Sequence, residues 1–311
     1  MTDSDATSPA EEGVMPTRAG FVALIGAPNA GKSTLLNRLV GSKVSIVTHK
    51  VQTTRALVRG IGMHGNAQII FVDTPGIFAP KRRLDRAMVT TAWGGAADAD
   101  LVALLIDARK GLTDEVEAIL KKLADAPMKK VLILNKVDVC SRDNLLALTK
   151  AANDKVAFER TFMVSALTGD GTDDLLDYLA AEMPAGPWLY PEDQVSDLPM
   201  RWLAAEVTRE KLMLRLHEEL PYASTVETEG WTEAKDGGVR IEQVIYVARE
   251  SQRKIVLGKG GSSIKAISMA ARKELAEMLG QPVHLFLFVK VRSNWADDPE
   301  RYREMGLDFP T

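Results

Sequence analysis

The order of hydrophobic and polar positions changes part-way along the chain. In the first part, nearly continuous apolar runs alternate with stretches in which apolar residues recur every three or four positions. Continuous apolar runs are typical of strands buried on both faces of a parallel sheet. We expect strands at 21–26, 67–73, 101–107, 130–136 and 160–166, and helices at 33–40, 114–126, 144–153 and 172–182. This alternation predicts a doubly wound α/β domain whose ligand binds at the carboxyl ends of the strands.

A proline-rich stretch ends this pattern. Residues 183–199, MPAGPWLYPEDQVSDLP, contain four prolines and are interpreted as a linker. After them the order changes. We expect a helix at 200–219, alternating segments at 222–233 and 239–249, a glycine loop, a helix at 262–279 and a last strand at 282–291. This order predicts a second, α+β domain that does not repeat the first.

Composition narrows the class of protein. The chain has 311 residues, 46% hydrophobic and 26% charged, as in an ordinary globular protein of two domains. It has no apolar run of about 18 residues and no secretory leader, so we expect a cytoplasmic protein without a transmembrane segment. Its single cysteine, Cys140, excludes an internal disulfide, and a packing role is favoured over a catalytic one.

Charge is uneven along the chain. The formal net charge of −3 gives no sign of nucleic-acid binding for the whole protein. Between Arg249 and Arg292, however, there are nine basic and three acidic residues, a local net charge of +6. A basic window of this kind is either a solvated face or the footprint of a phosphate-binding surface.

The sequence GAPNAGKS matches the pattern GxxxxGKS and lies between a predicted strand and a predicted helix. Backbone N–H groups of 29–33 would surround the β-phosphate of a nucleotide, Lys32 would reach the β- and γ-phosphates, and the Ser33 hydroxyl would bind Mg²⁺. The nucleotide-binding residues expected here are Gly26, Ala27, Pro28, Asn29, Ala30, Gly31, Lys32 and Ser33.

Three further motifs follow at predicted strand ends. In DTPG, Asp73 would hold the Mg²⁺ and the Gly76 N–H would meet the γ-phosphate. In NKVD, the carboxylate of Asp138 would pair with guanine N1–H and the exocyclic amine, and SAL would offer a backbone contact to guanine O6. The residues expected at the nucleotide are Asp73, Thr74, Pro75 and Gly76, then Asn135, Lys136, Val137 and Asp138, then Ser165, Ala166 and Leu167. Together the four motifs predict a GTP-binding domain.

The catalytic groups are less clearly marked. QTTR at 52–55 offers two threonines to complete the Mg²⁺ shell, and Thr54 is favoured over Thr53. We therefore expect Ser33, Thr54 and Asp73 as metal ligands. Ile77 follows DTPG where Ras-like GTPases place a water-orienting glutamine, so hydrolysis is expected to be slow or to need charge from elsewhere.

A resemblance indicates where that charge could come from. Asn29 resembles the asparagine with which GTPases related to the tRNA-modification enzyme MnmE hold a potassium ion beside the phosphates. It implies K⁺ as a second cofactor beside Mg²⁺. The expected catalytic residues are Lys32, Thr54 and Asn29.

The second glycine loop, GKGGSS at 258–263, lacks the spacer and the lysine–hydroxyl pair of a nucleotide loop. Its GxxG, set between apolar positions and inside the basic window, resembles the loop with which KH domains clamp a nucleic-acid backbone. The expected element order, helix–strand–strand–helix–strand, fits a type II KH domain. The RNA-binding residues expected here are Lys254, Gly258, Lys259, Gly260, Gly261 and Lys265.

The two domains together resemble the Era family of bacterial GTPases. The resemblance covers about 18–308 and includes GAPNAGKS, QTTR, DTPG, NKVD, REKLM at 209–213, ELPY at 219–222, and PVHL, VKVR and WADD between 282 and 298. It implies binding of GTP and GDP, binding of 16S rRNA near its 3′ end, a role in 30S ribosomal subunit assembly, and peripheral association with the inner membrane. Trp295 matches the family, and a packing role is favoured for it.

We therefore expect a disordered tail at 1–17, an α/β P-loop GTPase domain at 18–183, a linker at 184–199 and an α+β type II KH domain at 200–311. As a mechanism, Mg²⁺-GTP would order the loops at 44–60 and 76–95, which would then contact or release the KH half.

Other functions fit parts of the sequence. An MnmE-type GTPase would need a functional cysteine in a C-terminal domain, whereas Cys140 lies in the first domain, and a tandem GTPase such as Der would need a second set of motifs. In a membrane-acting GTPase the C-terminal half could bind lipid or protein in place of RNA, and the basic window would also attract anionic lipid. The GxxG, together with the lack of a clear amphipathic insertion helix, favours RNA.

Overall fold

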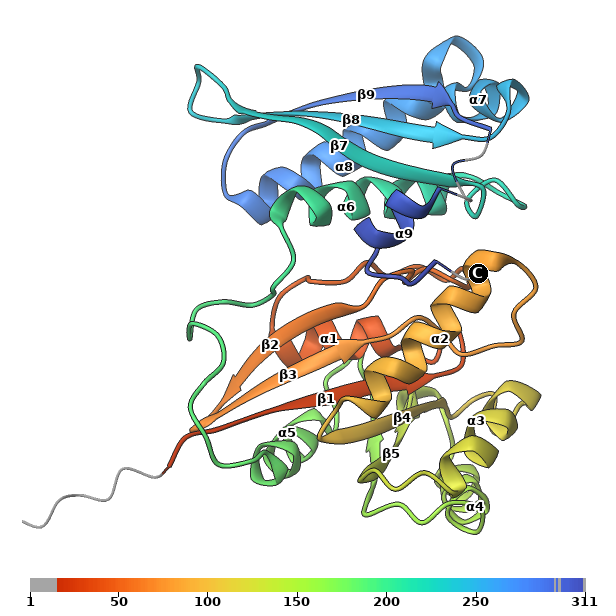
Figure 1. Ribbon diagram of the computed structural model, residues 1–311, viewed down its shortest axis with the longest axis vertical. Helices are drawn as coiled ribbons and strands as arrows, with labels where there is room; N and C mark the ends of the chain where they lie inside the picture. The colour runs from red at the N-terminus through yellow and green to blue at the C-terminus, as the bar shows by residue number, and fades with distance from the viewer. Residues whose placement is uncertain (1–15, 294, 296–297, 310–311) are drawn as a thin grey trace, which may run out of the picture.

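The computed structural model describes residues 16–293, 295 and 298–309. Residues 1–15 of the predicted tail lie outside this part of the chain. The two domains are stacked, with a loop segment running between them along one side (Figure 1). The first is a doubly wound α/β domain and the second an α+β domain, so the predicted fold class is confirmed.

The first domain is built on a six-stranded sheet in the order β2-β3-β1-β4-β5-β6. Only β2 is antiparallel to its neighbour, β3. β3 and β4 consist of buried residues throughout, as expected for strands covered on both faces. The strands are β1 Arg18–Gly26, β2 Val58–His64, β3 Ala67–Asp73, β4 Leu101–Asp107, β5 Lys130–Asn135 and β6 Thr161–Val164.

Helices cover both faces of this sheet. α1 Lys32–Val40 and α5 Thr172–Glu182 pack on one face through a cluster that includes Leu36 and Leu179. The other face is covered by α2 Arg83–Ala97, α3 Asp114–Ala124 and α4 Arg142–Asn153. A short 3₁₀ turn, η1 Val137–Val139, follows β5. All loops of the predicted nucleotide motifs follow the carboxyl ends of strands in this layered arrangement.

Two elements of this domain were missed because glycines obscure their patterns. The predicted loop at 44–60 already enters β2 at Val58, and β2 contains Gly60 and Gly62. A Cβ at Gly60 would lie 2.6 Å from Leu36, so this glycine lets α1 approach the sheet. The predicted loop at 76–95 contains most of α2, whose buried face is made largely of small residues and which carries a glycine pair.

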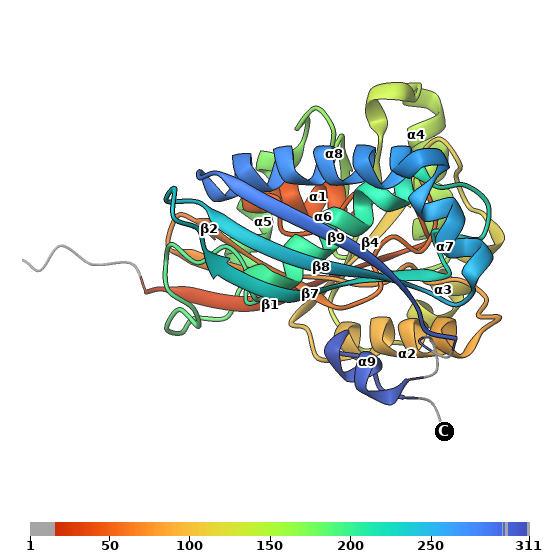
Figure 2. The same cartoon turned by 90° about the horizontal axis from the view of Figure 1, so that it is seen from above.

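The second domain has a three-stranded sheet in the order β7-β8-β9, with β7 and β8 antiparallel and β8 and β9 parallel. α6 and α8 pack on one face of it through Val207, Ala271 and Leu275 (Figures 1 and 2). Its elements are α6 Met200–Arg215, β7 Ser224–Glu233, β8 Val239–Val247, α7 Glu250–Leu257, η2 Lys259–Gly261, α8 Ser262–Leu279, β9 Val283–Val291 and α9 Pro299–Glu304.

Three expectations for this domain were wrong. The helix expected at 200–219 ends at Arg215, because Leu216 turns into extended backbone and is buried in the domain core. The expected order lacked α7, which buries only Val256 and so shows no apolar stripe at helical spacing. It also lacked α9, which spans six residues.

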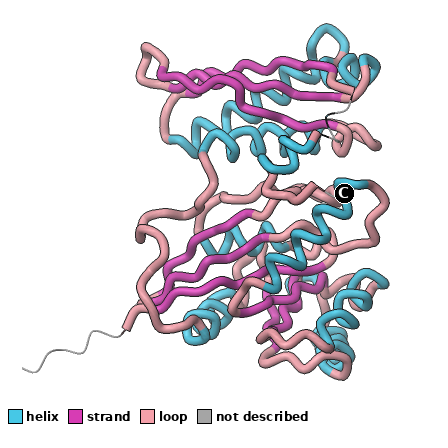
Figure 3. The backbone as a smooth tube through the Cα atoms, viewed as in Figure 1, coloured by secondary structure: helices cyan, strands magenta, loops and turns pink. Residues whose placement is uncertain are grey.

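The segment between α5 and α6 is a loop that follows the edge of the first sheet (Figure 3). The side-chain oxygen of Gln68 accepts hydrogen bonds from Leu189 N at 2.8 Å and Tyr190 N at 2.9 Å, and Ser196 forms an isolated bridge with Gly60. The segment is therefore tied to the first domain. Across the described ranges, no helix is both long enough and apolar enough to span a membrane.

Candidate nucleotide site and RNA-binding surface

The first glycine loop joins β1 to α1 and is shaped by contacts within the domain. Gly31 precedes α1 at φ 100°, and a Cβ there would clash with the Asn135 side-chain nitrogen. A Cβ at Gly26 would lie 2.5 Å from the Leu105 carbonyl oxygen. Both positions therefore require glycine, the first through its φ angle and both through close approach. The loop leaves its N–H groups at the N-terminus of α1, where a phosphate is favoured.

Lys32 is buried beneath this loop. Its Nζ donates hydrogen bonds to the carbonyl oxygens of Gly26 and Ala27, each at 3.2 Å. Burial lowers the pKa of Lys32 to about 8, although the charge of Asp73 acts in the opposite direction. Phosphate oxygens beside Nζ would favour its charged form, so the site is built for an anion.

The three predicted metal ligands lie together at the end of β3. Ser33 Oγ donates to Asp73 Oδ2 at 2.6 Å and is 2.9 Å from Thr54 Oγ1, which is 3.5 Å from Asp73 Oδ2. Asp73 is fully buried, and within the described part of the chain its Oδ1 has no hydrogen-bond partner. Burial raises the pKa of Asp73, while Lys32 and the hydroxyls oppose this shift. Hydroxyl and carboxylate oxygens around an unpaired buried oxygen fit Mg²⁺.

The two threonines of QTTR point in different directions. Thr53 Oγ1 is 2.7 Å from Thr48 Oγ1 and donates to the Lys50 carbonyl oxygen at 2.8 Å. Thr54 lies instead with Ser33 and Asp73, as favoured from the sequence. Ser45, which was not predicted, also reaches this group, because its Oγ donates to Asp73 Oδ2 at 2.9 Å. A serine in an irregular loop gives no sequence signal for such a role.

The loop after β5 is braced against the first glycine loop. Asn135 Nδ2 donates to the Ala30 carbonyl oxygen at 2.9 Å, and Asn135 Oδ1 accepts from Ala166 N at 3.0 Å. Lys136 Nζ donates to the Asn29 carbonyl oxygen and to Asp107 Oδ2, each at 2.7 Å. NKVD is thus joined directly to the phosphate loop, and SAL is joined to NKVD through Asn135.

Asp107 is a further residue that the sequence did not single out. Burial by itself would raise the pKa of Asp107, but hydrogen bonds from Arg109 and Lys136 hold it at about 2. The carboxylate therefore stays ionised at neutral pH and fixes Lys136. It ends β4, so its position at a carboxyl strand end was the only signal available.

Some of the remaining predicted site residues are exposed and others are buried. Asp138 and Leu167 are exposed, so they are open to a base. A Cβ at Gly76 would lie 3.0 Å from Pro28, closer than ordinary contact, so this glycine lets the loop after β3 approach the first glycine loop. Thr74 is fully buried and donates to the Leu24 carbonyl oxygen at 2.8 Å, which fits a structural role. A small cavity over the phosphate loop is lined by Pro28, Asn29, Gly31, Lys32, Ser33, Thr34, Ile46, Val47, Thr48, Gln52, Thr53, Thr54 and Gly76.

The second glycine loop joins α7 to α8 on the surface of the second domain. Gly258, Gly260 and Gly261 all have positive φ. A Cβ at Gly258 would lie 2.7 Å from Ser263, whereas a Cβ at Gly260 or Gly261 would meet nothing within 4 Å. Lys254, Lys259 and Lys265 are exposed around it. The turn itself requires glycine, and its outer side is open to a ligand.

Comparisons with known proteins agree with this arrangement. The family "50S ribosome-binding GTPase" matches residues 21–136, and the family "KH domain" matches residues 219–296. "GTPase Era" of Rhizobium meliloti is 72% identical over 310 residues, covering 100% of this chain and 98% of that protein. "GTPase Era" of Agrobacterium fabrum is 70% identical over 313 residues, with 100% and 98% covered.

The chain belongs to the Era family of GTPases. Two solved Era structures have the same fold, each with a TM-score of 0.88, 38% sequence identity, and coverage of 93% of this chain and 99% of theirs. One is Aquifex aeolicus Era, as a single-residue variant, bound to GDP·AlF4⁻, and the other is Era in complex with MgGDPNP and nucleotides 1506–1542 of 16S ribosomal RNA. The resemblance drawn from the motifs is confirmed, as is the prediction that this protein is a GTPase.

In this Era-family chain, the segment that carries Thr54 also contacts the second domain. Lys43 Nζ lies 2.8 Å from Glu210 Oε2, and Val47 N donates to Glu210 Oε1 at 2.8 Å. Arg55 is buried and donates to the carbonyl oxygens of Pro221, Tyr222 and Ser224 at 2.9–3.3 Å. The irregular segment at 42–57 is therefore held between the nucleotide site and the KH half.

A second contact between the domains involves α2 and the C-terminal end of the chain. α9 lies beside α2 in both views (Figures 1 and 2). Tyr302 and Leu307 pack with Ala87 and Met88 of α2 in one buried cluster. Trp295 is 2% exposed and its Nε1 donates to the Ala223 carbonyl oxygen at 3.2 Å, which fits the packing role favoured for it.

Proposed function

We propose that this protein is a GTP-dependent switch that binds small-subunit 16S rRNA near its 3′ end and acts in 30S ribosomal subunit assembly. The observation that carries the proposal is the joining of a complete set of guanine-nucleotide motifs to an exposed, positively charged GxxG turn in one chain. The Era complex with MgGDPNP and 16S rRNA nucleotides supports it by similarity over nearly the whole chain.

At the nucleotide, Lys32 and the N–H groups of the first glycine loop would hold the phosphates. Ser33, Thr54 and Asp73 would hold Mg²⁺, which would neutralise phosphate charge. The buried Asp73 Oδ1 supports this assignment, since a buried oxygen without a partner is costly unless a cation approaches it. Asn29 donates its amide N–H to the His49 carbonyl oxygen at 3.0 Å, and its amide oxygen would be the ligand of a second cation such as K⁺.

Base selection would rest on Asp138, which is exposed at η1 beside the braced loop. Asp138→Asn exchanges a double acceptor for a donor–acceptor pair, so it should shift preference from guanine to xanthine nucleotides. Competition binding with GTP and XTP measures this shift, and unchanged GTP selectivity would remove Asp138 from the base site. Wild-type protein measured with ATP is the control for base discrimination.

On the second domain, Gly260 and Gly261 would let an RNA backbone approach, while Lys254, Lys259 and Lys265 add electrostatic attraction. The tie between segment 42–57 and the KH half supports coupling of the nucleotide state to RNA binding. The resemblance also implies peripheral association with the inner membrane, and here a membrane surface is the competing ligand for the same basic window.

The test compares RNA with lipid. A fluorescent oligonucleotide of the 16S rRNA 3′ end and vesicles containing anionic phospholipid are titrated at several salt concentrations with the GTP analogue present. Salt-dependent retention on the oligonucleotide and none on the vesicles is expected. Retention on vesicles alone would replace the rRNA proposal with a membrane-acting GTPase.

A further inference from the structure

The segment that carries Thr54 is held by a few hydrogen bonds of its own and by contacts from both domains. Residues 42–57 contain neither helix nor strand. On the GTPase side, Asn37 Oδ1 accepts from Val44 N at 2.9 Å and Ser45 N at 3.0 Å, which fixes the start of the segment. The residues on either side of Thr54 are contacted from the other domain. The first of these contacts is made by a buried arginine of α6.

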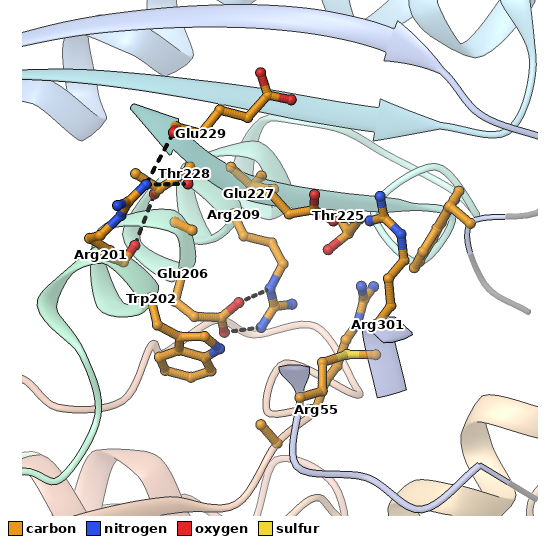
Figure 4. A pocket seen from close by; sticks show the side chains of 15 residues that line it. Arg55, Arg201, Trp202, Glu206, Arg209, Thr225, Glu227, Thr228, Glu229 and Arg301 are labelled. Atoms are coloured by element: carbon orange, nitrogen blue, oxygen red, sulfur yellow. Dashed lines mark hydrogen bonds and ion pairs between the residues drawn. The ribbon is translucent and has the colours of Figure 1, made fainter. Parts of the chain in front are cut away.

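Arg209 is 1% exposed and is oriented by Glu206, one turn earlier on α6. Its Nε is 2.7 Å from Glu206 Oε1 and its Nη2 is 2.5 Å from Glu206 Oε2, a two-point ion pair that fixes the guanidinium plane (Figure 4). The same Nη2 donates to the carbonyl oxygen of Thr53 at 2.5 Å. This carbonyl belongs to the rigid peptide plane that includes the nitrogen and the Cα of Thr54.

The other flank of Thr54 is held by the same domain. The Arg55 side chain donates to three carbonyl oxygens before and at the start of β7, and its guanidinium carbon lies 5.8 Å from the ring centroid of Trp295. Burial, and then the neighbouring charge of Arg209, lower the pKa of Arg55. The backbone on both sides of Thr54 is therefore fixed by an arginine. Arg55 of the same segment binds carbonyl oxygens of the second domain, and Arg209 of α6 binds the Thr53 carbonyl oxygen.

We infer that Arg209 is a positioning residue of the GTPase reaction, supplied by the KH half of the same chain. It holds the Thr53–Thr54 peptide plane, and through it the Thr54 hydroxyl, beside Ser33 and Asp73. Arg209 itself contacts neither of these two side chains. The inference rests on the proposed role of Thr54 as an Mg²⁺ ligand, and it gives the KH domain a specific part in completing the nucleotide site.

The expected effect is selective for the triphosphate. Thr54 is expected to contact the metal only when a γ-phosphate is present, so loss of its anchor should weaken Mg²⁺-dependent binding of a GTP analogue and spare GDP. A charge-assisted hydrogen bond of this kind corresponds to about a tenfold effect. A general loss of structure would instead weaken GDP and the GTP analogue together.

The measurement is binding of fluorescent GDPNP and GDP by the full chain over a range of Mg²⁺ concentrations. Arg209→Ala should raise the Mg²⁺ concentration for half-maximal GDPNP binding about tenfold and leave GDP affinity within about twofold. Arg209→Lys keeps the charge but lacks the planar guanidinium, so its Mg²⁺ requirement for GDPNP binding should lie between those of wild type and Arg209→Ala. Arg201→Ala is the matched control, since Arg201 donates to the Thr228 and Glu229 carbonyl oxygens within its own domain, and it should match wild type.

A double-variant cycle separates this inference from the proposal on which it rests. In a Thr54→Ala background, Arg209→Ala should have no further effect on the Mg²⁺ requirement, because the group that it positions is gone. If Thr54→Ala by itself changes nothing, the proposed metal role of Thr54 fails. If Thr54→Ala has its effect and Arg209→Ala has none, or if the two effects add, the positioning role of Arg209 is wrong.

Removing Arg209 leaves Glu206 without its partner, and this can unfold the domain. The paired variant Glu206→Gln with Arg209→Met removes both charges together and keeps much of the side-chain volume. Thermal unfolding of each variant shows whether it is folded. A folded paired variant with wild-type Mg²⁺ dependence for GDPNP would overturn the inference.

Discussion

The two glycine loops have similar residues and opposite surroundings. In the first, glycine makes room for the protein itself, since a Cβ at Gly31 would clash with Asn135 and one at Gly26 would meet Leu105. In the second, Gly260 and Gly261 face open space. The lysines differ in the same way, because Lys32 is buried whereas Lys259 is exposed. The proposed nucleotide site is thus built into the fold, and the proposed RNA clamp is presented on its surface.

The largest expected effect tests the buried lysine. Lys32→Ala should reduce GTP and GDP affinity by at least about 100-fold, because the charge-assisted phosphate contacts are lost. Equilibrium binding of fluorescent nucleotides measures this. Thermal unfolding of the variant is the control, since it shows whether Lys32→Ala leaves the domain folded. An affinity close to wild type would mean that the first loop is not the phosphate site.

The next effect tests the close approach of Gly31 to the Asn135 side chain. Gly31→Ala adds a clash with Asn135 to an unfavourable positive φ and should lower the free energy of unfolding by at least about 2 kcal/mol. Gly41→Ala is the matched control, since Gly41 ends α1 at φ 75° with nothing within 4 Å of an added Cβ. Gly41→Ala should lower the free energy of unfolding by only about 1 kcal/mol. Equal losses in urea denaturation would show that the close approach at Gly31 is unimportant.

A third effect tests whether RNA binds at the second glycine loop. Gly261→Asp places a negative charge where an RNA phosphate is expected and should weaken oligonucleotide binding about tenfold or more. Gly280→Asp, at the other end of α8 with φ 63° and open space, is the control for backbone strain. Similar RNA affinities for the two variants would place the RNA elsewhere on the domain.

The smallest effect concerns a single exposed charge. Lys259→Ala should lower RNA affinity by a few-fold and reduce the slope of log affinity against log salt concentration by about 1, as for one phosphate contact. Lys273→Ala removes a charge from the same basic window on an exposed part of α8 and should leave the slope unchanged. Equal slopes for both variants would argue for diffuse attraction in place of a clamp.

Sequence patterns predicted the elements whose hydrophobic pattern matches their burial in the folded domain. Strands β3 and β4 are apolar throughout, so their runs were unmistakable. β2 and α2 were missed because glycines interrupt their patterns, and only the assembled domain shows that Gly60 makes room for Leu36 of α1. α7 buries a single side chain, so its sequence has no apolar residues at helical spacing from which a helix could be predicted.

The same distinction holds for the site. The four nucleotide motifs were recognisable because their spacing follows from the ligand. Ser45, Asp107 and Arg209 were not, because each acts through another residue: Asp73, Lys136 and the peptide plane before Thr54. Residues that support a ligand-binding group from a distance along the chain leave no local pattern in the sequence.

The central claim is that the two loops work as one switch. It is tested most directly by binding of a fluorescent oligonucleotide of the 16S rRNA 3′ end to the full chain at fixed salt, once with a GTP analogue and once with GDP. The account predicts tight binding that requires the GTP analogue, since the segment at 42–57 contacts both the nucleotide site and the KH half. Equal affinity in the two states would contradict it.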